Sequence, residues 1–300
     1  MDILQLGDVE VTRVPEVENG PFATSTEFIP DSDPATWESN QSWLAPNYWD
    51  PETNQAQACL QTFVLRSAGR TILVDTGAGN GKDRPHFPVF GHLETDFLDR
   101  LAQAGVRPEE VDVVICTHLH VDHVGWNTVL RDREWVPTFP NAQYLFNRAD
   151  FEFWNPVNGH TQRGKLLNQN VFEDSIAPVH RAGQVVFWDD THNVDENLSL
   201  QVAPGHTPGL GVLTLRSGSD RAVFVGDLMH SPVQIIRPDW NSCFCEDPEQ
   251  ARASRRKVLS LAAAQNALVV PAHFGGAHAV EVVPDGNDFA IKSWATFATG

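Results

Sequence analysis

Four side chains of the kinds that bind metal ions fall within six residues, in the stretch His118-Leu119-His120-Val121-Asp122-His123. Imidazole and carboxylate groups are the ligands that Zn²⁺ and similar divalent metals prefer. The chain holds 12 histidines in 300 residues. At that frequency, a chance His-x-His-x-Asp-His run is expected on the order of once per thousand chains of this size. The run therefore predicts a metal site.

Three further candidate ligands each follow an apolar run that predicts a buried strand. If these strands end at one edge of the sheets, their loops place the three side chains together on rigid supports. The candidates are His206 after the strand expected over 198–202, Asp227 after 222–225 and His273 after 268–270.

Seven nitrogen and oxygen ligands are too many for one tetrahedral zinc ion, which takes four. They suit two divalent ions that share a carboxylate and a water molecule. Two cations lower the pKa of a shared water from 15.7 toward about 7 or below, which makes hydroxide available at neutral pH. This chemistry predicts a hydrolase with a metal-bridging hydroxide as nucleophile, and no serine or cysteine nucleophile is needed.

In their order along the chain, these residues resemble the motifs of the metallo-β-lactamase superfamily, over nearly the whole sequence. The resemblance implies an α/β fold, an αββα sandwich of two mixed sheets flanked by helices, with two metal ions at one sheet edge. It also matches Asp75 to an acidic residue that supports the site from behind the ligands. Carried over position by position, it implies that His118, His120 and His206 bind the first ion, that Asp122, His123 and His273 bind the second, and that Asp227 bridges them.

Details of the motifs separate branches of this superfamily. Flavodiiron oxidoreductases carry an acidic residue where His120 stands, and zinc β-lactamases lack a bridging aspartate at the position of Asp227. Glyoxalase II usually continues its motif with two glycines, where this chain has Gly125-Trp126. The segment from Gly226 to His230 is most similar to the methyl parathion hydrolase and N-acyl homoserine lactonase group. Typical homoserine lactonases have tyrosine at the position of His230, and methyl parathion hydrolases have histidine.

The expected function is therefore a binuclear metal-dependent hydrolase that cleaves ester, lactone or phosphotriester bonds of a small apolar molecule. We expect two divalent ions, with zinc as the first choice and manganese, iron or cobalt as alternatives. Two other activities remain open, a glyoxalase II-type thioester hydrolase and a mononuclear iron dioxygenase on the same fold. The candidate catalytic residues are Asp122, Asp227 and His230, and His230 is either a group that orients the substrate or a structural histidine.

The elements that must position these residues follow from periodicity and capping signals. A helix is expected over 95–104, and Asp247-Pro248-Glu249 supplies the N-cap and first turn of another helix that ends near Ala264. From Gly20 to Gln55 the pattern becomes irregular, rich in Pro, Asp and Asn with six large aromatic residues. We expect a long loop there that packs on the core, covers the pocket or forms a dimer surface. Residues 141–184 are expected to add helices and loops at one rim, and no linker divides the chain into separate domains.

Composition limits the partners. There are 21 Lys and Arg against 39 Asp and Glu, a net charge of −18 with neutral histidines. Such an acidic surface repels phosphate backbones and anionic lipids, so nucleic acid is excluded as an expected partner. No signal peptide or membrane span is recognised, and the expected location is cytoplasmic. The four cysteines are interpreted as ordinary thiols. A small-molecule substrate and a possible homodimer are the remaining expectations.

Overall fold

The computed structural model describes residues 2–160, 167–295 and 297–299. Within them, one mixed sheet of nine strands forms one half of the molecule. Along the sheet the order is β10-β9-β6-β5-β4-β2-β1-β18, and β3 pairs with β4 outside this path. These strands are β1 (Asp2–Leu6), β2 (Val9–Thr24), β3 (Trp49–Asp50), β4 (Gln55–Ser67), β5 (Arg70–Val74), β6 (Val113–Ile115), β9 (Gln143–Asn147), β10 (Val185–Trp188) and β18 (Ala298–Thr299).

A second sheet of seven strands, again counted within the described ranges, runs in simple sequence order from β11 to β17. A separate hairpin pairs β7 with β8. The strands of this sheet are β11 (Thr191–Asn193), β12 (Leu198–Val202), β13 (Gly211–Ser217), β14 (Asp220–Gly226), β15 (Leu268–Pro271), β16 (Val280–Asp285) and β17 (Asp288–Trp294), and the hairpin is β7 (Thr128–Arg131) with β8 (Glu134–Pro137).

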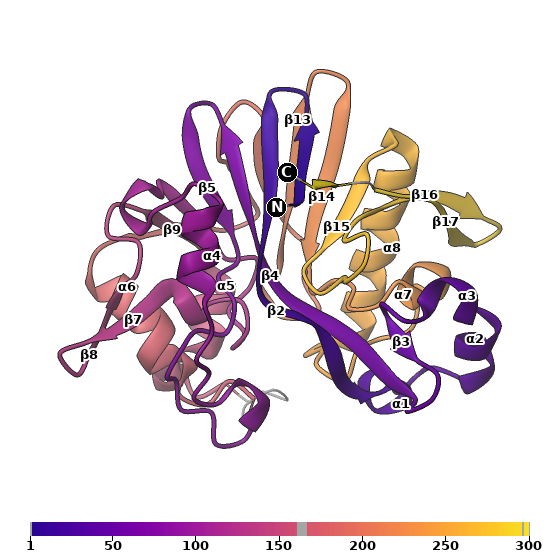
Figure 1. Cartoon of the computed structure of the whole chain (residues 1–300), viewed down its shortest axis with the longest axis horizontal. Helices are drawn as coiled ribbons and strands as arrows, with labels where there is room; N and C mark the ends of the chain where they lie inside the picture. The colour runs from indigo at the N-terminus through magenta and orange to yellow at the C-terminus, as the bar shows by residue number, and fades with distance from the viewer. Residues whose placement is uncertain (1, 161–166, 296, 300) are drawn as a thin grey trace.

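Helices cover the outer faces of both sheets (Figure 1). The helices α4, α5 and α6 lie beside the first sheet, and α8 packs along the second, against β14, β15 and β16. The expected αββα sandwich is therefore confirmed. The helices are α1 (Ser25–Phe28), α2 (Pro34–Ser39), α3 (Gln41–Leu44), α4 (Phe97–Gln103), α5 (Arg148–Trp154), α6 (Ala177–Arg181), α7 (Val233–Ile236) and α8 (Pro248–Gln265), with a π-helical turn at Phe172–Ile176.

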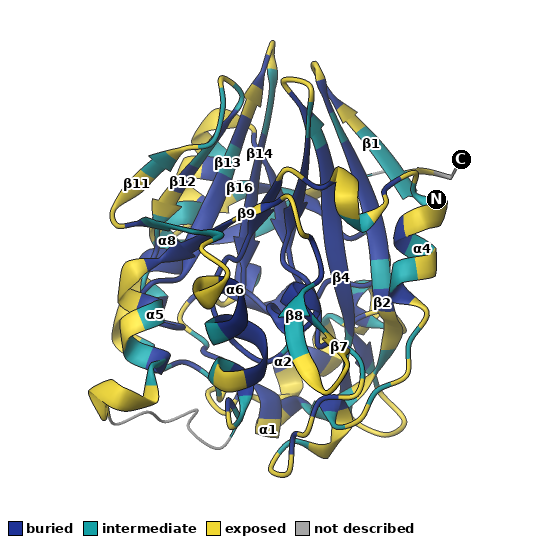
Figure 2. Ribbon diagram, turned by 90° about the vertical axis from the view of Figure 1, so that its left-hand side faces the viewer, coloured by how far each residue is buried: buried dark blue, intermediate teal, exposed yellow. Residues whose placement is uncertain are grey.

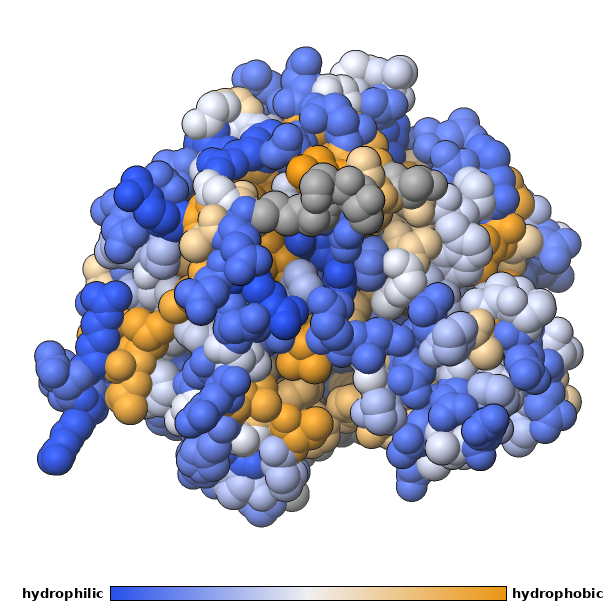
Figure 3. Space-filling model, in the orientation of Figure 1, coloured by the Kyte–Doolittle hydropathy of each residue, from blue (hydrophilic) through white to orange (hydrophobic). Residues whose placement is uncertain are grey.

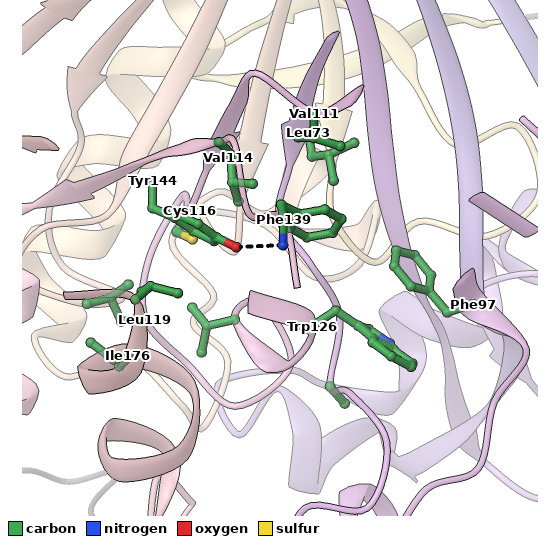
Figure 4. Packing of buried hydrophobic residues seen from close by; sticks show 14 of the residues in the cluster. Leu73, Phe97, Val111, Val114, Cys116, Leu119, Trp126, Phe139, Tyr144 and Ile176 are labelled. Carbon is green, nitrogen blue, oxygen red and sulfur yellow. Dashed lines mark hydrogen bonds between the residues drawn. The ribbon is translucent and has the colours of Figure 1, made fainter. Parts of the chain in front are cut away.

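Apolar side chains fill the space between the sheets and both outer layers, so the sheets are mostly buried in Figure 2. Between the sheets, the rings of Phe63 on β4 and Phe224 on β14 lie 5.4 Å apart. Phe97, the first residue of α4, packs on Trp126 (Figure 4). Their ring centres lie 5.4 Å apart and the rings are stacked. In the same cluster the Tyr144 hydroxyl accepts a hydrogen bond from the Phe139 backbone N–H at 3.3 Å. This packing holds the strand ends rigid.

The two helices expected from their signals are present with shifted ends. The helix expected over 95–104 is the shorter α4. Helix α8 begins at Pro248, where the Asp247 side chain accepts a hydrogen bond from the Gln250 backbone N–H at 3.0 Å. It ends at Gln265, and Asn266 then takes a left-handed conformation with φ of 49°. Such a residue is a common helix terminator.

The expectation of a long irregular loop from Gly20 to Gln55 is wrong. The segment holds the end of β2, three short helices and β3. Its Pro and Asp residues act as helix-start signals, since Asp33 accepts a hydrogen bond from the Thr36 backbone N–H at 2.8 Å and Pro34 is the first residue of α2. Trp37 and Tyr48 are buried in the core beside α8 and β17. Simple packing therefore accounts for much of the aromatic content.

The rim segment expected over 141–184 carries β9, α5, the π-helical turn and α6, and residues 161–166 of it lie outside the described residues. No helix of the described residues is long and apolar enough to cross a membrane.

Candidate metal centre

Four strands from the two sheets deliver all seven predicted ligands to one edge of the sandwich. The run from His118 to His123 follows β6, and the other three residues follow β12, β14 and β15. Since β14 and β15 are parallel neighbours, their carboxyl ends meet at the same edge. The seven side chains fall into two groups able to hold an ion. These are His118, His120, His206 and Asp227 in the first group, and Asp122, His123 and His273 in the second.

In the first group, three ring nitrogens converge. Nε2 of His118 lies 3.0 Å from Nδ1 of His120, and Nε2 of His206 lies 3.1 Å and 2.9 Å from these two atoms. Oδ2 of Asp227 lies 3.6 Å from His118 Nε2 and 3.3 Å from His206 Nε2. Ligand atoms about 2.0–2.1 Å from a tetrahedral zinc ion lie roughly 3.3 Å from one another. The four atoms thus have the spacing of one coordination shell.

The second group uses the other oxygen of Asp227. Oδ1 lies 3.2 Å from Nε2 of His123 and 2.9 Å from Nε2 of His273. The carboxylate of Asp122 lies 3.6 Å from the first of these nitrogens and 3.5 Å from the second. Asp227 therefore faces each group with one oxygen, which is the placement a bridging ligand needs.

Unsatisfied atoms at this edge fit bound cations. Nε2 of His123 and Oδ1 of Asp227 are buried without a hydrogen-bond partner among the described residues, although 3.2 Å separates them. Such orphaned polar atoms are costly inside a protein unless an ion or water satisfies them. Burial alone would raise the pKa of Asp227, but the surrounding imidazoles hold it well below its usual range. An ionised aspartate between two clusters of imidazole nitrogens is a suitable donor set for two divalent ions.

Hydrogen bonds behind the ligands fix the direction of their rings. Nδ1 of His123 lies 2.9 Å from Oδ2 of Asp75, and Nδ1 of His273 lies 2.9 Å from the carbonyl oxygen of Cys59. Both contacts place the ring proton on Nδ1 and leave the Nε2 lone pair for a metal. Asp75 also accepts hydrogen bonds from the backbone N–H and hydroxyl of Thr117 at 2.8 Å and 3.0 Å. It therefore lies where the resemblance implied a supporting acid.

Asp150 on α5 is a buried acid that the sequence interpretation missed. Its carboxylate accepts hydrogen bonds from the Leu119 backbone N–H at 3.1 Å, the Thr207 hydroxyl at 2.9 Å and the Gly209 backbone N–H at 2.6 Å. Burial raises the pKa of Asp150 to about 6. It ties the loop of His118 and His120 to the loop of His206. No local spacing marks it in the sequence.

Glu16 on β2 is the second missed acid. It accepts hydrogen bonds from the backbone N–H groups of Ala78 and Gly79 at 2.6 Å and 2.9 Å, and from the indole of Trp126 at 2.7 Å. Burial outweighs these bonds and raises the pKa of Glu16 to about 7. Through these hydrogen bonds, Glu16 links the turn that follows Asp75 to the side chain of Trp126. No local spacing distinguishes it from the other two acids of β2.

A pocket of about 810 Å³, counting its mouth, opens above the two groups. Asp122, Asp227 and His273 form part of its floor, and five phenylalanines form its walls. Among the described lining residues there is no Lys or Arg, and the one acid outside the ligand set is Glu18. The protein surface in Figure 3 is mostly hydrophilic, with hydrophobic side chains gathered in a few places that include the lower centre of the view. The wall phenylalanines are Phe22, Phe28, Phe87, Phe90 and Phe244.

His230 lies at the junction of floor and wall. Its Nε2 is 3.0 Å from Oδ2 of Asp227, and its ring meets Phe28 edge-on at 5.4 Å. Neither ring nitrogen has a partner in hydrogen-bond geometry among the described residues, although the side chain is 3% exposed. Burial lowers the pKa of His230 to about 4. The structure therefore places a neutral imidazole with unused hydrogen-bonding capacity beside the pocket.

Comparison with known proteins identifies relatives of this chain. A model of the metallo-β-lactamase superfamily matches residues 61–273, which include all seven candidate ligands. Metallo-β-lactamase domain-containing protein 1 of Xenopus laevis is 28% identical over 204 residues, 68% of this chain and 66% of that protein. N-acyl homoserine lactonase AiiB of Agrobacterium fabrum is 25% identical over 97 residues, 29% of this chain and 35% of that protein. The matches thus span about two thirds and one third of these relatives.

Two solved structures share the fold over nearly the whole chain. One is AidC, a dizinc quorum-quenching lactonase in complex with a product, N-hexanoyl-L-homoserine, with a TM-score of 0.79 at 21% identity, covering 99% of this chain and 98% of that one. The other is AbOPH, a hydrolase in the β-lactamase superfamily, with a TM-score of 0.78 at 24% identity, covering 100% and 98%.

Proposed function

The chain belongs to the metallo-β-lactamase superfamily, and we propose that it is a binuclear metal hydrolase that cleaves ester, lactone or phosphotriester bonds of small uncharged molecules. The observation that carries the proposal is the pocket, in which a floor of metal-ligand side chains meets walls of phenylalanine without a cation among the described lining residues. Such a site can polarise a bond while binding an apolar body.

The ligand roles follow from the two groups. His118, His120 and His206 would hold one ion, Asp122, His123 and His273 the other, and Asp227 would be shared. Zinc is the first choice, because the donors are imidazoles and carboxylates. Two divalent ions would supply Lewis acidity and make hydroxide available at neutral pH.

The chain's own side chains then orient the substrate. The phenylalanine walls bind the apolar part and exclude water, which strengthens electrostatic interactions at the floor. His230 has ring nitrogens free of hydrogen bonds beside the pocket, so it is a candidate catalytic residue that contacts the leaving group or the developing oxyanion. Asp122 and Asp227 would act as ligands whose negative charge would keep the cations in place.

The same pocket weighs against the two other activities. A glyoxalase II-type enzyme binds a thioester of an anionic peptide, and anion recognition calls for basic side chains. The described pocket lining has none, and Glu18 at its edge adds a negative charge. A mononuclear iron dioxygenase needs one set of ligands, whereas seven donors in two groups support two ions. The sequence similarity to the N-acyl homoserine lactonase AiiB of Agrobacterium fabrum favours the same choice.

A substrate panel tests the proposal. Zinc-loaded protein is assayed with a neutral aryl ester, a neutral aryl phosphotriester, N-hexanoyl homoserine lactone and a glutathione thioester, and chelator-treated protein serves as the control. At least one of the three neutral substrates should have kcat/KM about 100-fold or more above that of the thioester, since an unpaired charge in an apolar site costs several kcal/mol. A preference for the thioester would contradict the proposal. Oxygen consumption with a thiol substrate and one iron per chain would favour the dioxygenase.

A further inference from the structure

The histidines of the candidate metal centre differ in the atom that contacts the ring nitrogen facing away from the ligand cluster. In four of them Nε2 faces the ligand cluster and Nδ1 points away from it. For three of the four, Nδ1 meets an oxygen atom, from Thr117 at 3.2 Å, Asp75 at 2.9 Å or Cys59 at 2.9 Å. His206 is the exception. Its Nδ1 has one partner among the described residues, Sγ of Cys245 at 3.9 Å.

Cys245 is held firmly in that place. The residues that follow it pair with the His206 loop, because the Glu246 N–H donates to the His206 carbonyl at 3.0 Å and the Asp247 N–H donates to the Gly205 carbonyl at 2.8 Å. On its other side, the Ser242 hydroxyl lies 3.7 Å from Sγ. The residue is 1% exposed, so bulk solvent does not reach the sulfur.

The segment before Cys245 is anchored independently. Arg255 on α8 is fully buried and donates a hydrogen bond to the Trp240 carbonyl at 2.9 Å and another to Oδ1 of Asn241 at 3.3 Å. A buried guanidinium with several carbonyl partners is costly to disturb. The sulfur therefore approaches His206 from a fixed frame, and a change at Cys245 should affect the imidazole before it affects the backbone.

We propose that Cys245 is a positioning residue of the first ion-binding group, in which its sulfur holds Nδ1 of His206 and so directs Nε2 toward the ion. This inference rests on the proposed function. Groups that hold the outer nitrogen of a metal-bound histidine fix its orientation and tautomer, and their loss typically costs about 10- to 100-fold in metal affinity. A cysteine that merely fills space could be replaced by alanine without such a loss.

Cys243 provides a matched control. It lies two residues away, is exposed, and its backbone N–H donates to the Phe28 carbonyl at 2.9 Å. Its side chain does not line the pocket. Cys243→Ser therefore removes a thiol from the same segment without touching His206.

The test measures zinc binding rather than turnover. Metal-free wild type, Cys245→Ala, Cys245→Ser and Cys243→Ser are titrated with Zn²⁺ in competition with a chromophoric chelator, and the melting temperature of each metal-free protein is recorded. We expect Cys245→Ala to raise one of the two dissociation constants about 10- to 100-fold. The other constant should change less than about threefold. Cys245→Ser keeps a hydrogen-bonding atom and should recover part of the affinity, and Cys243→Ser should match the wild type.

Two results would overturn the inference. In the first, Cys245→Ala binds both ions as tightly as the wild type. In the second, both constants change alike in proportion to a lowered melting temperature of the metal-free protein, which indicates a role in stability alone. Failure of the proposed function looks different, because wild-type protein would then bind no zinc, or a single ion whose affinity still reveals whether Cys245 matters.

Discussion

The side chains of the pocket floor and those of the pocket walls differ in whether other protein atoms satisfy their contacts. On the floor, buried imidazoles and carboxylates crowd within hydrogen-bonding distance, and atoms such as Oδ1 of Asp227 have no partner among the described residues. On the walls, rings such as Phe22 and Phe28, 5.2 Å apart, satisfy one another by packing. The floor thus leaves polar atoms unsatisfied among the described residues, whereas the wall rings satisfy one another. We infer that changes to the floor alter the rate of the chemical step and changes to the walls alter substrate affinity.

The largest effect is expected at the shared ligand of the floor. Asp227→Ala removes the carboxylate that faces both groups, so kcat should fall by at least about 10²-fold, because even residues behind metal ligands contribute 10- to 100-fold. Zinc content should fall as well. The matched control is Asp239→Ala, which removes a 59% exposed carboxylate paired with Arg256. A near-normal kcat for Asp227→Ala would show that this residue does not bridge two ions.

Ionisation of Glu16, which binds the turn behind the floor, should make the free energy of unfolding depend on pH. Its pKa is raised from 4.5 to about 7. A raised pKa gives a stabilising contribution that is full below pH 4.5 and is lost as the pH rises through 7. Glutamine cannot ionise, so the free energy of unfolding of Glu16→Gln, relative to wild type, should rise by about 2 to 3 kcal/mol between pH 5 and pH 8.5. Urea unfolding of both proteins measures this difference, and parallel pH curves would disprove the assignment.

A wall substitution should alter affinity instead. Phe87 is half-buried and packs against Phe90 at 4.9 Å. Phe87→Ala should raise KM for an aryl ester about 10-fold, because about 1 to 3 kcal/mol of apolar contact is lost, while kcat stays within about twofold. Phe151→Ala is the control, a half-buried ring on α5 that packs 5.3 Å from Phe172 and does not line the pocket. A fall in kcat with an unchanged KM would contradict the inference that the wall residues determine substrate affinity.

A change of similar size, in the preference between substrates, is expected at position 230, where floor and walls meet. A tyrosine hydroxyl at position 230 can donate a hydrogen bond to the developing oxyanion of a lactone while it stays neutral. Compared with wild type, His230→Tyr should shift the ratio of kcat/KM values toward homoserine lactones and away from activated aryl esters by about 10-fold, or 1.4 kcal/mol. Kinetics on equally metal-loaded samples give the ratio. An unchanged ratio would mean that His230 is structural.

The polar residues of the floor could be predicted from the sequence, whereas most of the wall residues could not. The run from His118 to His123 is local, so its spacing alone indicated the metal site. The candidate ligands His206, Asp227 and His273 follow recognisable strands, and the fold brings those strand ends together as expected. Covering a pocket is one of the roles expected for the aromatic residues of Gly20–Gln55, and Phe22 and Phe28 do line it. Wall residues as distant in sequence as Phe87 and Phe244 share no spacing with them, so the full lining could not be predicted.

The errors have physical causes as well. The Gly20–Gln55 segment looked irregular because its helices have only four to six residues, which is too few to show a helical period. Glu16 and Asp150 gave no usable signal, since their partners are mostly backbone N–H groups of distant loops. The contact of Cys245 with His206 depends on how two loops pair, so no local spacing indicates it.

Hydrolysis that depends on two ions at this floor can be tested by titrating metal-free protein with Zn²⁺ while measuring both bound zinc and the hydrolysis rate of the best neutral substrate. We expect close to two bound ions per chain, activity that reaches its maximum only with the second equivalent, and a higher melting temperature when both are bound. Full activity at one ion per chain, or activity that survives complete removal of metal, would contradict this expectation.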